Sequence, residues 1–157
     1  MEKIKIGGIL CHENLTMLRI HGIVGKVDAG AVLLSEFGAR KVNLQFIVQL
    51  IDQSGHDQLT LAVDQSDARL AFDIVVGLQH QIGAVSINLK LGVASLGIFG
   101  PDFRIRPGIA GNFLTCLNEQ RIPIYAVSTS ISTCSALIAE SEVSKAKTAL
   151  AARFILP

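Results

Sequence analysis

One helix-and-strand pattern occurs twice in this sequence, and its two copies are 80 residues apart. In each copy a strand-like segment ends in a ring-bearing residue followed by glycine, at His21-Gly22 and at Phe99-Gly100. A short basic loop, an apolar helix pattern and an alternating strand come next. Four apolar positions correspond between the copies: Leu33, Phe37, Val42 and Leu44 match Phe113, Leu117, Ile122 and Ile124. Such a repeat predicts two similar modules of roughly 75 residues each.

Hydrophobic periodicity predicts the order β-βαββαβ-βαββα. Helices are expected after the capping residues Asp28, Ser66 and Ser141, and around Ile109, Phe113 and Leu117. The alternating segments predict strands at residues 3–9, 14–21, 42–50, 59–63, 84–91, 93–99, 122–129 and 133–139.

The number of strands predicts how the two modules share the chain. The second copy ends in a helix and lacks a closing strand, whereas the chain opens with a strand that the first copy does not need. We therefore expect Ile4–Ile9 to cross over and complete the second sheet. The modules would be residues 12–90, and residues 2–11 together with 91–157. Each is expected to be an α+β sandwich, a four-stranded antiparallel sheet with two helices on one face.

Composition indicates an oligomer and disfavours several classes of partner. Charged residues make up 17% of the chain, against about 25% in typical domains, so part of the surface is expected to contact another subunit. No apolar run approaches the roughly 18 residues that span a bilayer, and no signal peptide is evident, which predicts a cytoplasmic protein without a membrane partner. A net charge of +1, one tyrosine and no tryptophan disfavour nucleic acid. Three widely spaced cysteines, Cys11, Cys116 and Cys134, fit reduced core residues better than disulfides or a metal site.

No pattern predicts a catalytic site or a cofactor. The stretch GIFGPDFRIRPGIAG does not have the spacing of a nucleotide-binding glycine motif. The four histidines fall on different predicted elements, and the hydroxyl-rich segment from Ser128 to Ser135 lacks the G-x-S-x-G pattern of a nucleophile.

Two basic loops lead into helix N-termini, where unpaired N–H groups and a nearby cation favour a carboxylate. The first loop contributes Lys26, Asp28, Ala29 and Gly30, and the second contributes Arg104 and Arg106. The alternative interpretation is that these cations are simply solvated.

Polar side chains on two predicted strands form a second group of candidates. Strand alternation predicts that Asn43, Gln45 and Gln49 share one face, where their amides would suit both ends of a zwitterion. A solvent-facing polar strand is the alternative. Ser128 and Ser130 belong to a row of hydroxyls that either faces a small polar ligand or forms a polar hairpin tip.

These residues carry a resemblance to a known family. The segment IGGILCHENLTMLRIHGIVGKVD, with VNLQFIVQ and its hairpin, resembles the regulatory region of aspartate kinases, and GIFGPDFRIRPGIAGNFLTCLNEQRIPIYAVSTS resembles the second ACT module of that region. The resemblance implies two ferredoxin-like βαββαβ ACT modules that pair in a homodimer. It also implies an amino-acid effector, lysine or threonine, at the module interfaces. Asn43 and Gln49 match the family pattern, whereas Gln45 and Ile131 stand where acidic residues are usual.

Two hypotheses of function follow. The first is a regulatory module that binds an amino acid and acts on a catalytic kinase subunit or domain, which this sequence lacks. Its ligand carboxylate would meet the first loop, from Lys26 to Gly30, and its ammonium would meet Asn43, Gln45 or Gln49. The first copy is the expected site if only one copy binds. The second hypothesis, based on the altered loops, is a dimerisation or scaffold module that has lost effector binding.

Overall fold

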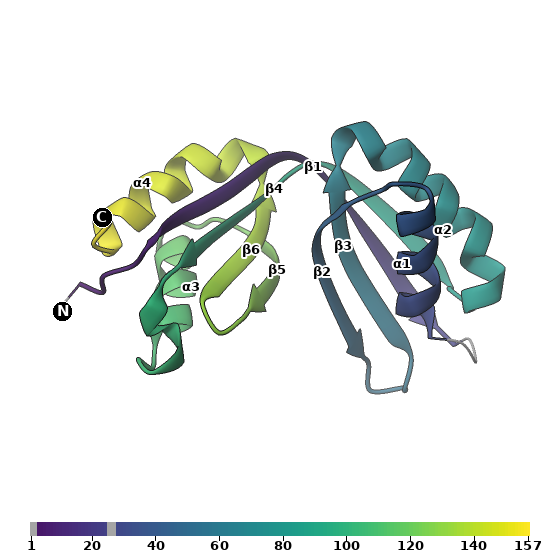
Figure 1. Cartoon of the computed structure of the whole chain (residues 1–157), viewed down its shortest axis with the longest axis horizontal. Coiled ribbons are helices and arrows are strands. Elements are labelled where there is room, and N and C mark those ends of the chain that lie inside the picture. Colours follow the sequence, from purple (N-terminus) through teal and green to yellow (C-terminus); the bar gives the residue numbers. More distant parts are fainter. Residues whose placement is uncertain (1–2, 25–27) are drawn as a thin grey trace. The chain divides into compact units, whose positions relative to one another are not determined.

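The computed structural model describes residues 3–24 and 28–157 (Figure 1). Over these residues it contains six strands and four α-helices: β1 (Gly8–Ile23), α1 (Ala29–Ala39), β2 (Leu44–Ile51), β3 (Asp57–Asp64), α2 (Ala68–Ile82), β4 (Ser86–Phe99), α3 (Ile109–Glu119), β5 (Ile124–Thr129), β6 (Thr133–Ala139) and α4 (Val143–Arg153). The chain divides into two compact units. The inserted unit is Asn14–Leu91, and the split unit combines the N-terminal residues through Glu13 with Gly92–Pro157.

The inserted unit packs α1 and α2 on one face of its strands. β3 pairs antiparallel with both β1 and β2, so the strand order in this unit is β2-β3-β1-β4. Leu33 and Phe37 of α1 lie in one apolar core with Leu59 and Leu61 of β3 and Ile74 of α2. The i, i+4 spacing on the helix and the i, i+2 spacing on the strand therefore bury the faces that the sequence predicted.

The split unit repeats this arrangement with α3 and α4. β6 pairs antiparallel with β4 and β5, which gives the order β1-β4-β6-β5. Its core joins Phe113 and Leu117 of α3 to Leu150 of α4 and to Ala136 of β6. The predicted α+β class, with antiparallel strands covered by helices, is confirmed.

The N-terminal segment groups with the split unit, but the strand expected over residues 3–9 differs in the structure: β1 begins at Gly8, and Lys5 forms an isolated parallel bridge with Ile155. Ile4 and Ile6 are buried in the core of that unit. The Ile6 N–H donates to the Ile155 carbonyl at 3.0 Å, and the Ile155 N–H donates to the Ile4 carbonyl at 2.9 Å. The Gly7 N–H donates to the Phe99 carbonyl, and the Phe99 ring lies so close to Gly7 that a Cβ there would be 2.7 Å from it. These contacts fix the beginning of the chain to β4 and to the segment that follows α4.

The sequence predicted a break between strands at residues 10–13 and another at residue 92. Both predictions were wrong. β1 runs without interruption through Asn14, and β4 runs through Gly92. Asn14 has φ of +56° and Gly92 has φ of +65°, and each lies at a boundary between the units. A local left-handed residue bends a strand without ending its pairing, so the breaks in alternation at these positions mark bends rather than ends.

The repeat extends to backbone details. Lys41, after α1, has φ of +59°, and Arg121, after α3, has φ of +56°. β2 and β5 each carry one extra residue at corresponding positions, Gln45 and Tyr125, where the pairing register shifts by one. Over the described residues, no helix is long and apolar enough to cross a membrane.

Candidate functional site

The first candidate site lies at the N-terminus of α1. Asp28 precedes this helix with φ of −67° and ψ of 104°, and its Oδ1 accepts a hydrogen bond from the Ala31 N–H at 3.0 Å. An Asp at this position satisfies one of the orphan donors of the first turn and places a negative charge at the positive end of the helix dipole. Ala29 and Gly30 follow as buried residues of the first turn.

Gln49, at the far end of β2, reaches the same place. A Cβ built on Gly30 would lie 2.9 Å from Oε1 of Gln49 and 3.2 Å from Oδ1 of Asp28. A Cβ at that separation would make the flexible Gln49 side chain move away, so glycine at position 30 lets the Gln49 amide lie against the helix N-terminus. The structure thus brings together three predicted site residues from two elements: Asp28, Gly30 and Gln49. We call them the α1 cluster.

The prediction that Asn43, Gln45 and Gln49 share one face was wrong. Gln45 is the extra residue of the bulge in β2, and a bulge of one residue reverses the alternation beyond it. Gln49 is opposite the core residue Leu59, on the helix-covered face. Gln45 donates instead to Oδ2 of Asp64 at 3.2 Å.

Asn43 also lies apart from Gln49. It is exposed just before β2. Its neighbour Val42 belongs to the core of the inserted unit, and its other neighbour, Leu44, packs against that core. Lys26, the cation predicted for this loop, lies outside the described residues.

The second candidate site lies at the N-terminus of α3 in the split unit. Gly108 precedes this helix with φ of +88°, and no described side chain caps its first turn. A pocket of about 240 Å³ opens here, lined by Phe103, Arg106, Pro107, Gly108, Ile109, Ala110, Thr129, Ser130, Thr133 and Cys134. We call it the α3 pocket. Uncapped N–H groups beside a cation form a favourable environment for an anion.

The hydroxyl-bearing residues divide between this pocket and other positions. Thr129 lines the pocket at the position that the repeat matches to Gln49, and it is opposite the core residue Cys134. Ser128 is opposite Ser135, so it points to the other face of the strands and does not line the pocket. The 80-residue offset from Gln49 could have identified Thr129 from the sequence.

Ser130 lines the pocket, but its hydroxyl also organises the β5–β6 turn. Its Oγ lies 2.7 Å from Oγ1 of Thr133 and accepts the N–H groups of Ser132 and Thr133 at 3.4 and 3.2 Å. Arg106 lines the pocket, whereas Arg104 is exposed and does not. Of the predicted residues in this copy, Arg106 and Ser130 are therefore brought together, and Arg104 and Ser128 are not.

Known proteins resemble this chain in sequence and in fold. Residues 96–154 match the model of the ACT domain family. The chain is 26% identical over 156 residues to the aspartate kinase Ask_LysC of Stutzerimonas stutzeri, covering 99% of this chain and 38% of that protein. The regulatory subunit of aspartate kinase from Thermus thermophilus, in a ligand-free crystal structure, superimposes with a TM-score of 0.85 over 95% of this chain and 98% of that one, at 17% identity.

The chain has the tandem ACT fold of aspartate kinase regulatory regions. The resemblance inferred from the residues is confirmed over nearly the whole sequence, and the chain spans 38% of the length of the curated relative. A further structural neighbour, E. coli aspartokinase III in complex with lysine and aspartate, superimposes with a TM-score of 0.71 at 14% identity, over 97% of this chain and 34% of that one.

Proposed function

We propose that this chain is an amino-acid-sensing regulatory module that acts on an aspartate kinase catalytic domain or subunit. The homology over 99% of the chain to an aspartate kinase supports a role in that enzyme, and the matched portion of the relative is 38% of its length. Binding of an effector would favour one arrangement of the ACT modules and bias the activity of the catalytic part. Couplings of this kind are typically worth about 1–3 kcal/mol.

The observation that carries the proposal is the α1 cluster. Oε1 of Gln49 and Oδ1 of Asp28 converge at the end of a helix, at 2.9 and 3.2 Å from the position that a Cβ on Gly30 would take. Both oxygens are hydrogen-bond acceptors, and an ammonium group has three donors to offer them. We assign the ammonium of the effector to Asp28 and Gln49, and its carboxylate to the first-turn N–H groups of the helix that Asp28 leaves unused.

Lysine is the effector that this chemistry favours over threonine. The Asp28 carboxylate lies at the cluster, and a ligand with an extra cationic group gains more from it than a neutral one. The structural neighbour E. coli aspartokinase III has been crystallised in complex with lysine and aspartate. Threonine is the second ligand to test.

The α3 pocket is the second candidate position for an effector. Its helix N-terminus is uncapped, and Arg106 lines it, so it suits a carboxylate better than an ammonium. The two copies of the repeat therefore differ in charge at the same structural position, which supports different ligands or one functional site per chain.

We further propose that two copies of the chain pair in a homodimer through β2. This strand lies at one end of the strand order and contains no charged residue. Leu50 and Ile51 are exposed on it, at 52% and 69%. An uncharged apolar edge strand is a template for pairing with another strand.

The alternative function is a scaffold module without an effector. One observation favours it: the Asp28 carboxylate already accepts the Ala31 N–H, so part of the α1 terminus is satisfied by the chain itself. A scaffold would keep the dimer and the fold but respond to no amino acid.

A thermal denaturation screen against the twenty amino acids separates the two functions. A ligand that binds the folded state raises the melting temperature by mass action. Lysine should raise it for the unaltered chain and not for Asp28→Asn or Gln49→Ala. Gln45→Ala is the matched control, an amide in the same strand on the opposite face, and should keep the response. A flat profile with an intact dimer would select the scaffold.

A further inference from the structure

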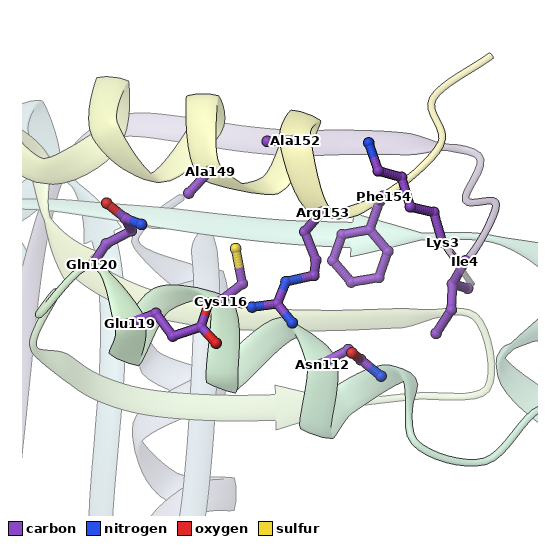
Figure 2. A pocket seen from close by; sticks show the side chains of 10 residues that line it. All are labelled: Lys3, Ile4, Asn112, Cys116, Glu119, Gln120, Ala149, Ala152, Arg153 and Phe154. Atoms are coloured by element: carbon purple, nitrogen blue, oxygen red, sulfur yellow. Dashed lines mark hydrogen bonds and ion pairs between the residues drawn. The ribbon is translucent and has the colours of Figure 1, made fainter. Parts of the chain in front are cut away.

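A second pocket of the split unit, separate from the α3 pocket, lies between α3 and α4. Its volume is about 320 Å³, and it is lined by Lys3, Ile4, Asn112, Cys116, Glu119, Gln120, Ala149, Ala152, Arg153 and Phe154. None of these residues lines the α3 pocket. Figure 2 shows Arg153 extending from α4 toward α3, with Lys3 and Ile4 at one end of the pocket and Gln120 at the other.

Arg153 and Glu119, which both line this pocket, form an ion pair. Arg153 is in the last turn of α4 and Glu119 is the last residue of α3. A cation at a helix C-terminus is favoured by the helix dipole, and Arg153 also offsets the less favourable position of Glu119. The side chain of Arg153 is 24% exposed and that of Glu119 is 55% exposed, so the pair is shielded from solvent mainly on the arginine side.

The corresponding groove of the inserted unit differs. There, Arg40 pairs with Glu36 on the same helix, and both side chains are about half exposed, at 53% and 43%. A pair of that kind is a solvated surface contact and contributes little. The two copies of the repeat have therefore diverged at this groove: the ion pair joins two helices in the split unit and lies within one helix in the inserted unit.

The ion pair uses only part of the hydrogen-bonding capacity of its two side chains, and Arg153 also interacts with the Cys116 side chain. A guanidinium has five N–H donors and a carboxylate has about four acceptor positions, so one mutual contact uses a fraction of each. Cys116 is buried beside Arg153, and burial raises the pKa of its thiol, which keeps it protonated and uncharged at neutral pH. The positive charge of Arg153 is thus balanced by Glu119 alone among these neighbours, and Lys3 adds a further cation at the open end.

The remaining walls are apolar. Ile4 and Phe154 are buried in the core of the split unit beneath the groove, and Ala149 packs against the same core. Small side chains at positions 149 and 152 of α4 leave the space that the pocket occupies. A ligand would meet paired opposite charges at one part of the pocket and hydrocarbon at another.

We propose that this pocket binds a free α-amino acid with an aliphatic side chain. Its carboxylate accepts hydrogen bonds from Arg153 and Lys3, its ammonium donates to Glu119, and its side chain lies on Ala149 and Ala152. The site is distinct from the α1 cluster and the α3 pocket and does not depend on lysine being the effector. It gives the split unit a ligand site of its own on its helix-covered side.

L-leucine is the probe, with two analogues that each lack one charged group: 4-methylpentanoate without the ammonium, and 3-methylbutylamine without the carboxylate. Calorimetric titration of the full chain should show saturable binding of L-leucine, and binding of each analogue weaker by about tenfold or more, since each loses a charged hydrogen bond. Equal affinity for L-leucine and 4-methylpentanoate would contradict the assigned role of Glu119.

Two variants and a control locate the site. Ala149→Leu fills the pocket without altering the ion pair and should abolish L-leucine binding. Arg153→Gln removes the charge and should weaken binding about tenfold or more. Ala151→Leu adds the same side chain at an exposed position of α4 that does not line the pocket, and should bind as the unaltered chain does.

The outcomes separate this site from the α1 cluster. Unchanged binding in Ala149→Leu, or absence of L-leucine binding to the unaltered chain at millimolar concentration, overturns the proposal. Loss of L-leucine binding in Gln49→Ala but not in Ala149→Leu also overturns it, and would instead assign leucine to the α1 cluster. Loss in Ala149→Leu with lysine binding retained supports two independent sites.

Discussion

Gly30 and Gln49 lie so close that a Cβ on the glycine would be 2.9 Å from Oε1 of the glutamine. The contact joins the first turn of α1 to the end of β2, two elements of the inserted unit that the repeat also places together in the split unit. The Gln49 amide of the candidate site can lie there because residue 30 is glycine, and a larger residue at position 30 would displace it.

The Gly30→Ala variant should disrupt the α1 cluster. Its methyl group would displace the Gln49 amide, so we expect lysine affinity to fall by about tenfold or more, as for loss of a hydrogen bond to a charged group. Gly38→Ala in the same helix is the control, because nothing lies within 4 Å of its Cβ position. It should stabilise the fold by about 0.5–1 kcal/mol and leave lysine binding unchanged. Calorimetric titration and urea denaturation measure the two effects.

The Thr16→Val variant should stabilise the chain. Thr16 is fully buried, and its hydroxyl has no hydrogen-bond partner among the described residues. Replacing the hydroxyl by a methyl of similar size removes a desolvated polar group, which is worth about 1–3 kcal/mol. Thr16→Ser keeps the hydroxyl and loses the methyl, so it should destabilise. Chemical denaturation of both variants tests this, and a Thr16→Val variant less stable than the unaltered chain would contradict the prediction.

Acid should selectively weaken the β2–β3 hairpin. The Asp52 carboxylate accepts the His56 N–H at 2.9 Å, the Ser54 N–H at 2.8 Å and Nε2 of Gln58 at 3.0 Å. These hydrogen bonds, that from His56 foremost, lower its pKa from the ordinary value of 3.8. A lowered pKa contributes stability that is present above 3.8 and is lost as pH falls through the folded-state value.

Melting temperatures measured from neutral pH down to below 3.8 check this contribution, with Asp52→Asn as the comparison. The stability of the variant should depend less steeply on pH below that value. Parallel profiles for the two proteins would show that the Asp52 hydrogen bonds do not contribute to acid sensitivity.

The three cysteines should differ in reactivity. Burial raises the pKa of Cys134 to about 11, and Cys134 and Cys116 are buried, whereas Cys11 is half-buried. The thiolate is the reactive form, so labelling of the folded chain at neutral pH should modify Cys11 first. Mass spectrometry of the labelled chain identifies the site, and labelling of Cys134 at the rate of Cys11 would contradict the burial of β6.

The fold was predictable because the repeat and the apolar spacing act together. Phe37 and Phe113 each lie in a core at the position that helix periodicity assigns, and Ile4 and Ile6 lie in the core of the split unit although residues 3–7 precede β1. The two long strands were not foreseen, because Asn14 and Gly92 interrupt the alternation without interrupting the pairing.

The candidate site was predictable only in part. Asp28 carries a capping signature that the sequence shows directly, and it caps α1. The amide strand was misassigned because a one-residue bulge at Gln45 reverses the alternation, and nothing in LQFIVQLI signals an extra residue. The Arg153–Glu119 pair joins residues 34 positions apart on two helices, which periodicity along one element cannot reveal.

Calorimetric titration with L-lysine measures whether the chain binds an amino-acid effector at the α1 cluster. We expect saturable binding to the unaltered chain, weakened about tenfold or more in Gln49→Ala and unchanged in Gln45→Ala. Absence of binding, or equal affinity in Gln49→Ala and the unaltered chain, would contradict this expectation.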